Sequence, residues 1–297
     1  MPLPFERFES VVSQKVATVV ADGSLRQFAF NVKNMNQHWL KLHQQNPADG
    51  TFKIICRASN KVIDAAGENL AIHTHLQQFV DTGSINQRWK IVPTDEDPNV
   101  FFIKAIDTNR VWDVPDASLA DGVQLQLFQL HGGNNQRWRI RPVEAVDHVF
   151  KIRSVASNLV LDVPGFSQND GGFIQQFQNN DGFNQLWQFI PLPDGRTKIR
   201  SVCSGKLLDY PLQSALQNQP AFVGQFDDNN GDNQTWKIKI LNQDALGHDV
   251  VNIISGFSVN NGLFLDVPNS SIATGVHIQT FPNNGGLNQR WQLTEVF

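Results

Sequence analysis

Short stretches of alternating hydrophobic and polar residues recur along the chain and predict β-strands. Residues 51–57 (TFKIICR) alternate with the period of two expected for a half-buried strand, residues 58–61 form a turn signal, and residues 62–66 resume an extended pattern. No segment keeps a helical period of 3.6 residues, and Gly, Asn, Asp and Pro interrupt the chain roughly every 8 to 12 residues. The sequence therefore predicts an all-β protein. The same pattern returns at residues 149–163, 197–210 and 251–267.

The tetrapeptide Asn-Gln-x-Trp divides the chain into repeats. Successive motif tryptophans lie 50, 49, 49, 49 and 55 residues apart, and six of the seven Trp residues belong to the motif. A fixed period of this size indicates one supersecondary unit copied six times, and we number the repeats one to six in chain order. The motifs are Asn36–Trp39, Asn86–Trp89, Asn135–Trp138, Asn184–Trp187, Asn233–Trp236 and Asn288–Trp291.

The repeat length predicts two domains. Short strands at even spacing favour a closed barrel or a sandwich, and repeats grouped in threes give two bodies of ordinary domain size. The stretch 141–147 follows the third motif and is the expected seam, which gives domain 1 as residues 1–143 and domain 2 as residues 144–297. A six-bladed propeller is the structural alternative, but the usual blade signatures are absent.

Composition favours a neutral polar ligand. The net charge of −4 and the pI near 6.0 argue against nucleic acid, which requires a basic surface. Charged residues make up only 18% of the chain, below the usual quarter, whereas Asn and Gln are frequent. No apolar run reaches about 18 residues, so we expect no membrane insertion.

The first residues and the two cysteines give an expectation for the cellular location of the protein. Residues 1–8 lack the basic and then apolar pattern of a signal peptide. Cys56 and Cys203 fall in corresponding predicted strands of different repeats, so we expect no bridge between them and a reducing environment. The sequence predicts a protein that is cytoplasmic or released without a classical signal.

The six Asn-Gln-x-Trp motifs resemble those of the ricin-type lectin family, whose β-trefoil repeats end in Gln-x-Trp. The resemblance covers all six repeats and implies two tandem β-trefoil domains of three lobes each. It also implies that the Trp fills the core and that the Gln before it fixes a local turn. In length and arrangement the chain is similar to the two-trefoil haemagglutinin subunits of clostridial neurotoxin complexes and to cytosolic two-domain lectins used in defence.

The resemblance further implies a sugar site formed by an Asp, an aromatic ring and the Asn that opens the motif. A carboxylate accepts strong, directional hydrogen bonds from hydroxyl groups, and a ring removes C–H surface from water. Four repeats match this pattern, with Phe fifteen and Asn twenty-two residues after the Asp. Their candidate carbohydrate-binding residues are Asp64, Gln77, Phe79, Asn86 and Gln87; Asp113, Gln126, Phe128, Asn135 and Gln136; Asp162, Gln175, Phe177, Asn184 and Gln185; and Asp266, Gln279, Phe281, Asn288 and Gln289.

The first and fifth repeats depart from the pattern. The first offers Asp22 but no aromatic residue at the matching distance, so we expect it to be structural only. The fifth has Asp209, Phe226 and Asn233, but two extra residues intervene and Gly224 replaces the Gln. We therefore leave the fifth repeat out of the predicted sites.

An architectural alternative applies to all of these residues. An Asp that closes a strand can cap a turn, and a repeated Phe can belong to the core. The joint recurrence of Asp, Gln-x-Phe and Asn, and their joint loss from the first repeat, favour a binding role. On that basis we expect Ala at Asp113, Asp162 and Asp266 to abolish binding with little change in thermal stability.

Other chemistry finds less support. His131 follows Phe128 by three residues, a place where the resemblance implies contact with the sugar. His73 and His75 have no third ligand at a sensible spacing, and one carboxylate per site is too few for calcium, so we expect no metal and no cofactor. Glycoside hydrolysis needs two carboxylates about 5 to 9.5 Å apart, and no nucleophile or phosphate-loop motif is present. We therefore expect no enzyme activity.

These observations predict a multivalent, metal-independent lectin or haemagglutinin. The resemblance implies galactose or N-acetylgalactosamine termini on glycoproteins or glycolipids as partners. The alternative is a toxin-complex or scaffold subunit whose trefoils bind a protein partner or a second copy of the chain. A trefoil protease inhibitor is a weaker alternative. Agglutination of red cells, and its inhibition by free galactose, separates the lectin from both.

Overall fold

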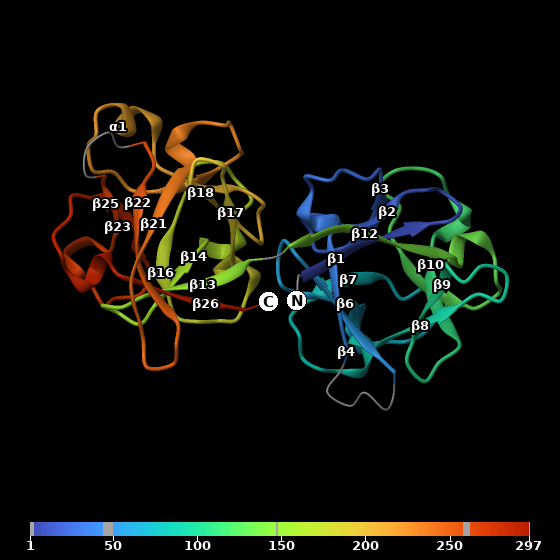
Figure 1. The fold of residues 1–297 in the computed structure, drawn as a ribbon. Coiled ribbons are helices and arrows are strands. Elements are labelled where there is room, and N and C mark those ends of the chain that lie inside the picture. The colour runs from blue at the N-terminus through green and yellow to red at the C-terminus, as the bar shows by residue number, and fades with distance from the viewer. Residues whose placement is uncertain (1–2, 44–49, 147, 258–261, 297) are drawn as a thin grey trace. The chain divides into compact units, whose positions relative to one another are not determined.

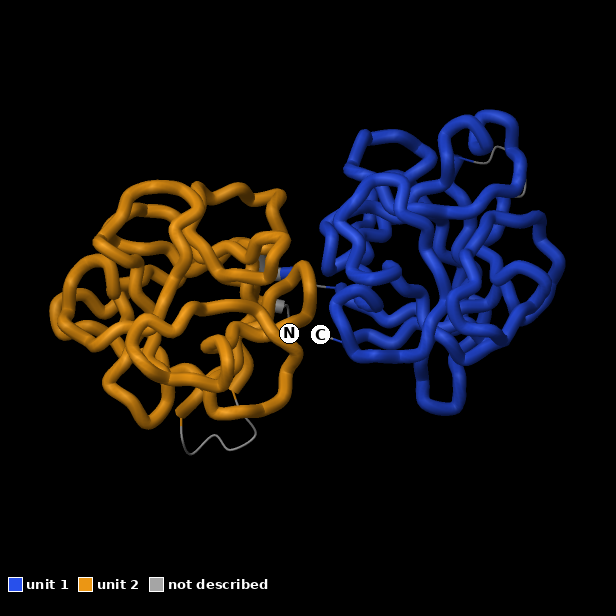
Figure 2. The backbone as a smooth tube through the Cα atoms, turned by 180° about the vertical axis from the view of Figure 1, so that it is seen from behind, with its two compact units in different colours: residues 1–2, 146–297 blue, residues 3–145 orange. Residues whose placement is uncertain are grey.

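Each group of three repeats closes its own barrel (Figure 1). The computed structural model describes residues 3–43, 50–146, 148–257 and 262–296. The chain divides into an N-terminal unit, Leu3–Ala145, and a C-terminal unit that begins at Val146 (Figure 2). The stretch 141–147, which we expected to be a seam, continues a strand as far as Val146.

In the N-terminal unit six strands pair in the closed order β1-β4-β5-β8-β9-β12, with β12 returning to β1. Three hairpins, β2–β3, β6–β7 and β10–β11, extend from this barrel. The strands are β1 (Leu3–Ser10), β2 (Val16–Val19), β3 (Leu25–Phe28), β4 (Trp39–His43), β5 (Phe52–Cys56), β6 (Val62–Ala65), β7 (Leu76–Phe79), β8 (Trp89–Pro93), β9 (Val100–Ala105), β10 (Arg110–Asp113), β11 (Gln126–Gln129) and β12 (Trp138–Val146).

The C-terminal unit repeats this plan. Its barrel runs β13-β17-β18-β21-β22-β26 and closes on β13, and its hairpins are β14–β16, β19–β20 and β23–β25. The strands are β13 (Val149–Ser154), β14 (Val160–Asp162), β15 (Gly172–Phe173), β16 (Gln175–Phe177), β17 (Trp187–Pro191), β18 (Thr197–Ser201), β19 (Leu207–Asp209), β20 (Gly224–Phe226), β21 (Thr235–Gln243), β22 (Asp249–Ser255), β23 (Phe264–Asp266), β24 (Val276–His277), β25 (Gln279–Phe281) and β26 (Trp291–Glu295).

A six-stranded barrel with three hairpins is a β-trefoil, so the predicted all-β fold of two trefoils is confirmed. The three hairpins of a unit also pair with one another in a cycle. In the C-terminal unit the cyclic partners are Phe173 with Gly224, Phe222 with Gln279, and His277 with Gln175. This cycle places the residue two before each Gln-x-Phe position beside the next lobe.

The six motif tryptophans occupy equivalent places in the two cores. Each is fully buried, which accounts for the fixed spacing of the motif, because burying a large aromatic ring stabilises a fold by about 2–3 kcal/mol. Each indole Nε1 also donates to a backbone carbonyl at 3.0–3.3 Å. The acceptors, in order of the repeats, are the carbonyls of Ala17, Ile63, Trp112, Leu161, Leu208 and Leu265.

Helical structure is confined to short pieces. One α-helix, α1 (Leu212–Leu216), lies in the fifth repeat and was not predicted. The 3-10 helices among the described residues are Met35–Gln37, Ala66–Glu68, Ile85–Gln87, Pro115–Ala117, Asn134–Gln136, Pro164–Phe166, Phe183–Gln185, Asp232–Gln234, Pro268–Ser270 and Leu287–Gln289.

The two cysteines are buried and are not joined in a disulfide. Cys56 ends β5, whereas Cys203 lies in the turn after β18. Our expectation that they fall in corresponding strands was therefore wrong, because Ser201 is the last residue of β18 and takes the place that Cys56 has in β5.

Candidate functional site

In the second, third, fourth and sixth repeats the predicted residues converge on one carboxylate. The Gln of Gln-x-Phe donates from Nε2 to Oδ1 of the Asp at 2.8–3.0 Å. The motif Asn donates from Nδ2 to Oδ2 at 2.6–2.8 Å, and the motif Gln donates from Nε2 to the same Oδ2 at 3.0–3.1 Å. The structure thus brings together the Asp, both Gln and the Asn in all four repeats.

Hairpin register explains this convergence. In the second repeat Asp64 on β6 lies directly opposite Gln77 on β7, and the equivalent pairs recur in the other three hairpins. Because side chains alternate across a strand, Phe79 lies on the same face as Gln77. The 3-10 helix Ile85–Gln87 then turns Asn86 and Gln87 toward the carboxylate.

The predicted stacking rings reach the surface in three of the four repeats. Phe79, Phe177 and Phe281 are exposed to between 37% and 48% of their area, which is unusual for so apolar a side chain. Phe128 is only half-buried, because two histidine rings lie against it. A core role for these rings is therefore excluded at the three exposed positions.

The second repeat encloses a hollow of about 250 Å³. Asp64, Gln77, Phe79 and Asn86 line it, so four of the residues that the resemblance implied face one space. Glu68, from the 3-10 helix after β6, also lines the hollow and was missed in the sequence. Its place four residues after Asp64, in the loop that leaves the strand, is the signal that could have identified it.

The motif Gln serves to position the carboxylate. Gln87 uses both Nε2 hydrogens, on Asp64 Oδ2 and on the Val80 carbonyl at 2.9 Å, and its Oε1 accepts from the Thr82 amide at 2.9 Å. The same three bonds recur at Gln136, Gln185 and Gln289. These side chains are buried behind the Asp, so no free hydrogen-bonding group of the motif Gln faces a ligand.

The motif Asn is also committed internally. Asn86 Nδ2 divides its two hydrogens between Asp64 Oδ2 and the Ala65 carbonyl. Asn135, Asn184 and Asn288 make the equivalent pair of bonds. What the Asn retains is its Oδ1, which in Asn86 and Asn184 is buried and has no hydrogen-bond partner among the described residues.

The carboxylates are nearly inaccessible, which changes our expectation for their removal. Burial raises the pKa of Asp162 and of Asp266 above the usual value, although the Gln hydrogen bonds act in the opposite direction. Ala at either position would leave two buried amide donors, from the motif Asn and Gln, without this acceptor, together with a third that is only partly buried. An unsatisfied buried donor costs about 1–3 kcal/mol, so from the structure we expect these variants to lose stability as well as binding.

The third repeat adds histidine to its site. His131 Nε2 lies 3.8 Å from Asp113 Oδ2, and its ring centroid is 6.0 Å from that of Phe128. His73, from the second repeat, lies on the other side, with its ring 5.0 Å from Phe128 and Nδ1 3.2 Å from Gln126 Oε1. His131 therefore lies where the sequence placed it, and His73 belongs to the rim of the neighbouring site.

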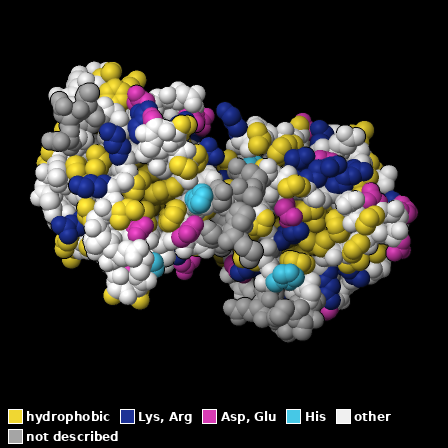
Figure 3. Space-filling view, in the orientation of Figure 1, with side chains coloured by type: hydrophobic (Ala, Val, Ile, Leu, Met, Phe, Trp, Pro, Cys, Tyr) yellow, Lys and Arg dark blue, Asp and Glu magenta, His cyan; other side chains and the backbone are white. Residues whose placement is uncertain are grey.

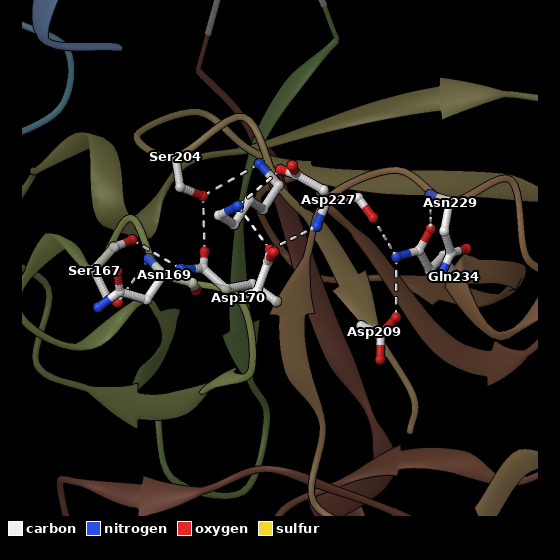
Figure 4. A network of polar contacts seen from close by, with 10 residues as sticks. Ser167, Asn169, Asp170, Ser204, Asp209, Asp227, Asn229 and Gln234 are labelled. Carbon is white, nitrogen blue, oxygen red and sulfur yellow. Dashed lines mark hydrogen bonds and ion pairs between the residues drawn. The ribbon is translucent and has the colours of Figure 1, made fainter. Parts of the chain in front are cut away.

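The fifth repeat, which the sequence left out, has most of the same arrangement. Asp209 Oδ2 accepts from Asn233 Nδ2 and from Gln234 Nε2, both at 3.0 Å (Figure 4 shows Asp209 with Gln234). Asp209, Phe226 and Asn233 line a hollow of about 300 Å³. The two inserted residues extend the loop around α1 and leave the hairpin register intact, since Asp209 still lies opposite residue 224.

The first repeat has lost the carboxylate. Its hairpin places Thr18 opposite Arg26, the positions that Asp64 and Gln77 hold in the second repeat. Gln37 Nε2 donates to the Thr18 hydroxyl at 3.0 Å, which is a hydroxyl version of the same contact. The candidate Asp22 instead lies in the turn, where it accepts from the Ser24 amide and hydroxyl.

Two further chemistries find no support in the described ranges. No group of three or more His, Cys, Asp or Glu side chains is placed there to hold a metal ion. No helix among the described residues is long and apolar enough to cross a membrane.

The fold and its polar-plus-aromatic hollows define a β-trefoil binding protein. A family model described as "Ricin-type beta-trefoil lectin domain-like" matches residues 35–128, 134–226, 183–259 and 232–297. These matches cover most of the chain, so the chain belongs to the ricin-type β-trefoil lectin domain-like family. The ricin B-like lectin fold suggests carbohydrate binding without catalysis.

Several solved structures are similar to this chain. ThreeFoil, a designed threefold-symmetric protein, is 31% identical with a TM-score of 0.45, over 50% of this chain and 100% of the design. The Macrolepiota procera ricin B-like lectin, solved with lactose, is 19% identical with a TM-score of 0.42, over 48% of this chain and 96% of the lectin.

A mosquitocidal holotoxin is 19% identical with a TM-score of 0.45, and the match covers 100% of this chain. The present chain spans 35% of the length of that toxin. No curated protein matches this sequence.

Proposed function

We propose that the chain is a non-enzymatic, multivalent lectin for glycans that end in galactose or N-acetylgalactosamine. The observation that carries the proposal is the second-repeat hollow, where Asp64, Gln77, Phe79 and Asn86 line one space. An exposed ring beside a carboxylate is the combination that a sugar needs, since one face of the sugar is apolar and its edge carries hydroxyls.

The hydrogen-bonding groups that Asp64 and Gln77 leave unused determine which groups a ligand must offer. A carboxylate oxygen accepts two hydrogen bonds, and within the described part of the chain Asp64 Oδ1 accepts one, from Gln77. The Gln77 amide retains its second hydrogen, so an acceptor and a donor lie side by side. Two vicinal hydroxyls match this pair. An axial 4-hydroxyl reaches the carboxylate while the apolar face of the same sugar rests on Phe79, which favours galactose-type sugars.

Multivalency compensates for shallow sites. A single site of this kind binds at about millimolar strength, which is about −4 kcal/mol. The N-terminal unit carries the second- and third-repeat sites, and the C-terminal unit carries the fourth and the sixth. Linking sites on one chain raises the effective affinity for a glycan-covered surface by roughly 10²- to 10⁴-fold.

We propose that sugar binding needs neither a metal ion nor a cofactor, because each site supplies a carboxylate surrounded by amide groups. Agglutination of red cells tests it, with free galactose at millimolar concentration as the competitor. We expect galactose to inhibit agglutination and EDTA to leave it unchanged. Hydrolysis of a galactoside by the protein would contradict the proposal that it is not an enzyme. In that case Asp64 and Glu68, which line the same hollow, would be the two carboxylates to examine.

A variant with Ala at Phe79, Phe128, Phe177 and Phe281 locates the activity. Three of these rings are exposed, so we expect the agglutination titre to fall at least about tenfold while the melting temperature changes little. Ile240→Ala on β21 is the matched control, since that side chain is 61% exposed and lines none of the hollows described above. If galactose binds nowhere on the wild-type chain, a scaffold subunit that binds a protein partner replaces the lectin.

A further inference from the structure

The fifth-repeat hollow is built differently from the others. Gly224 takes the position that Gln77, Gln126, Gln175 and Gln279 hold in the four matching repeats. Phe222 and Phe226 lie two residues to either side of Gly224 and are both exposed. Because glycine has no side chain, no amide group lies beside Asp209 as Gln77 lies beside Asp64, and Gly224, Asp209 and both rings line the hollow.

Because the fifth repeat has no Gln at this position, the Asp209 carboxylate can accept more hydrogen bonds from a ligand than the carboxylates of the four matching repeats. Asn233 and Gln234 both donate to Asp209 Oδ2. Oδ1 of Asp209 accepts no hydrogen bond from the described residues, whereas the equivalent oxygen in the other four repeats accepts one from the Gln. A ligand can therefore place two hydroxyl donors on this one oxygen.

The walls of the hollow are mostly apolar. Phe173 reaches it from the fourth repeat, with its ring 6.1 Å from that of Phe222, and Leu212 of α1 lines the opposite part with half of its area exposed. The Tyr210 hydroxyl lies 3.0 Å from the Ser214 carbonyl oxygen and 2.5 Å from that of Gln219, and its single hydrogen ties the side chain to the α1 loop through one of these carbonyls at a time. Hydrophobic side chains reach the surface in Figure 3 where Figure 1 places α1.

The lysines near the hollow are already paired with carboxylates. Lys206 Nζ lies 2.7 Å from Asp170 Oδ1 and from Asp227 Oδ1, in the network of Figure 4, and Lys198 pairs with Asp228 at 2.7 Å. Asp209 itself forms no ion pair within the described part of the chain. A neutral ligand that offers hydroxyl donors satisfies it without a cation.

From this geometry we infer a fifth binding site, selective for a galactose-type sugar that carries an apolar substituent. The sugar hydroxyls meet Asp209 Oδ1, the ring rests on Phe226, and the substituent fills the space between Phe222, Phe173 and Leu212. The inference rests on the proposed function, since it assigns a sugar to the hollow. It goes further in naming a site that the repeat pattern leaves out and a preference that the other sites do not share.

The NMR signals of glycine amides allow ligand binding to be followed at this site and at a reference site in one sample. In protein labelled with ¹⁵N-glycine, Gly224 and Gly171 lie in the fifth-repeat hollow and Gly67 in the second. The titrants are galactose, N-acetylgalactosamine, methyl β-galactoside and p-nitrophenyl β-galactoside. The first pair tests an acyl substituent and the second pair tests an aromatic one.

We expect the Gly224 signal to respond to at least one substituted sugar at a three-fold or more lower concentration than to its unsubstituted counterpart, with no such preference at Gly67. Equal response to both members of each pair, or no response at Gly224 while Gly67 responds, overturns the inference and leaves the proposed function standing. No response at either glycine overturns both.

Two variants link the preference to the hollow. Gly224→Gln restores the amide of the other repeats and should remove the preference. Its Cβ would lie 3.1 Å from the Gly172 carbonyl oxygen, so folding must be checked. Leu212→Ser, on the exposed face of α1, serves where Gly224→Gln fails to fold, and should reduce the preference for the aromatic galactoside at least twofold. The matched control is Leu246→Ser, an exposed leucine outside the hollow; an equal loss in both leucine variants would contradict the assignment.

Discussion

The first and fifth repeats both break the spacing of the other four, but with opposite results. In the first, Thr18 stands at the carboxylate position, and its hollow of about 380 Å³ is lined by an Asp121 that is already paired with Lys15 at 2.6 Å. In the fifth, Asp209 keeps its hairpin position and only the Gln is lost. Substitution of the Asp removes the carboxylate from the first hairpin, whereas the insertion in the loop of the fifth repeat leaves Asp209 in place.

The largest effect should be the same in both repeats. Trp39→Ala and Trp236→Ala each remove a fully buried indole, so each should lower the free energy of unfolding of its unit by about 3–5 kcal/mol. Urea unfolding followed by circular dichroism measures this. A much smaller cost for Trp39 would mean that a repeat without a carboxylate has also lost its role in the core.

Removing the side chain that accepts hydrogen bonds at the hairpin position should have a larger effect on stability in the fifth repeat than in the first. Asp209→Ala leaves both Asn233 Nδ2 and Gln234 Nε2 one acceptor short. Thr18→Ala leaves one donor, Gln37 Nε2, without this acceptor and removes the hydroxyl that donates to the Val16 carbonyl. At about 1–3 kcal/mol for each unsatisfied donor, the loss of stability at Asp209 should be roughly twice that at Thr18.

Binding provides the second readout of this pair. Titration with p-nitrophenyl β-galactoside should show the fifth site lost in Asp209→Ala and no change in Thr18→Ala. Equal stability losses, or a binding defect from Thr18→Ala, would contradict the contrast between the repeats.

The smallest expected effect is the contribution of one carboxyl group to the pH dependence of stability. The sign of this contribution differs between the first and the fifth repeat. Burial raises the pKa of Asp209, so the folded state holds this proton more tightly, and the carboxyl contributes stability that is lost as pH rises from about 3.8 through the raised pKa. Hydrogen bonds from Ser24 lower the pKa of Asp22, whose contribution is present above about 3.8 and is lost as pH falls through the lowered pKa.

Sugar binding at the fifth repeat requires the ionised Asp209. It should therefore weaken as pH falls, starting above pH 3.8, before acid unfolding begins. Titration of the Gly224 amide at several pH values measures this, and affinity that stays constant down to pH 3.8 would contradict it.

Much of the architecture could be predicted because it is periodic. The Asn-Gln-x-Trp motif marks core residues whose spacing the fold holds constant, and Asp64 with Gln77 and Phe79 could be grouped because their separation in sequence is the same in four hairpins. These predictions need only local strand pairing, which the alternating pattern reveals.

What the sequence did not reveal depends on register and on neighbouring lobes. The loop of the first repeat is shorter, so counting back from its motif does not reach Thr18, and only the hairpin pairing identifies it. His73 joins the site of another repeat through the cycle of hairpins, which no spacing records. Asn86 was expected to bind carbohydrate, but both of its amide hydrogens are used within the protein.

The hydrogen bond from each motif tryptophan has a consequence for how such a protein can evolve. The indole of Trp39 donates to the carbonyl of Ala17, and that of Trp236 to the carbonyl of Leu208, so the acceptor is a backbone atom that every amino acid possesses. The neighbouring residue that carries the carboxylate can therefore mutate without disturbing this bond. After duplication each lobe is free to drift toward a different ligand, or toward none, while the same barrel is retained.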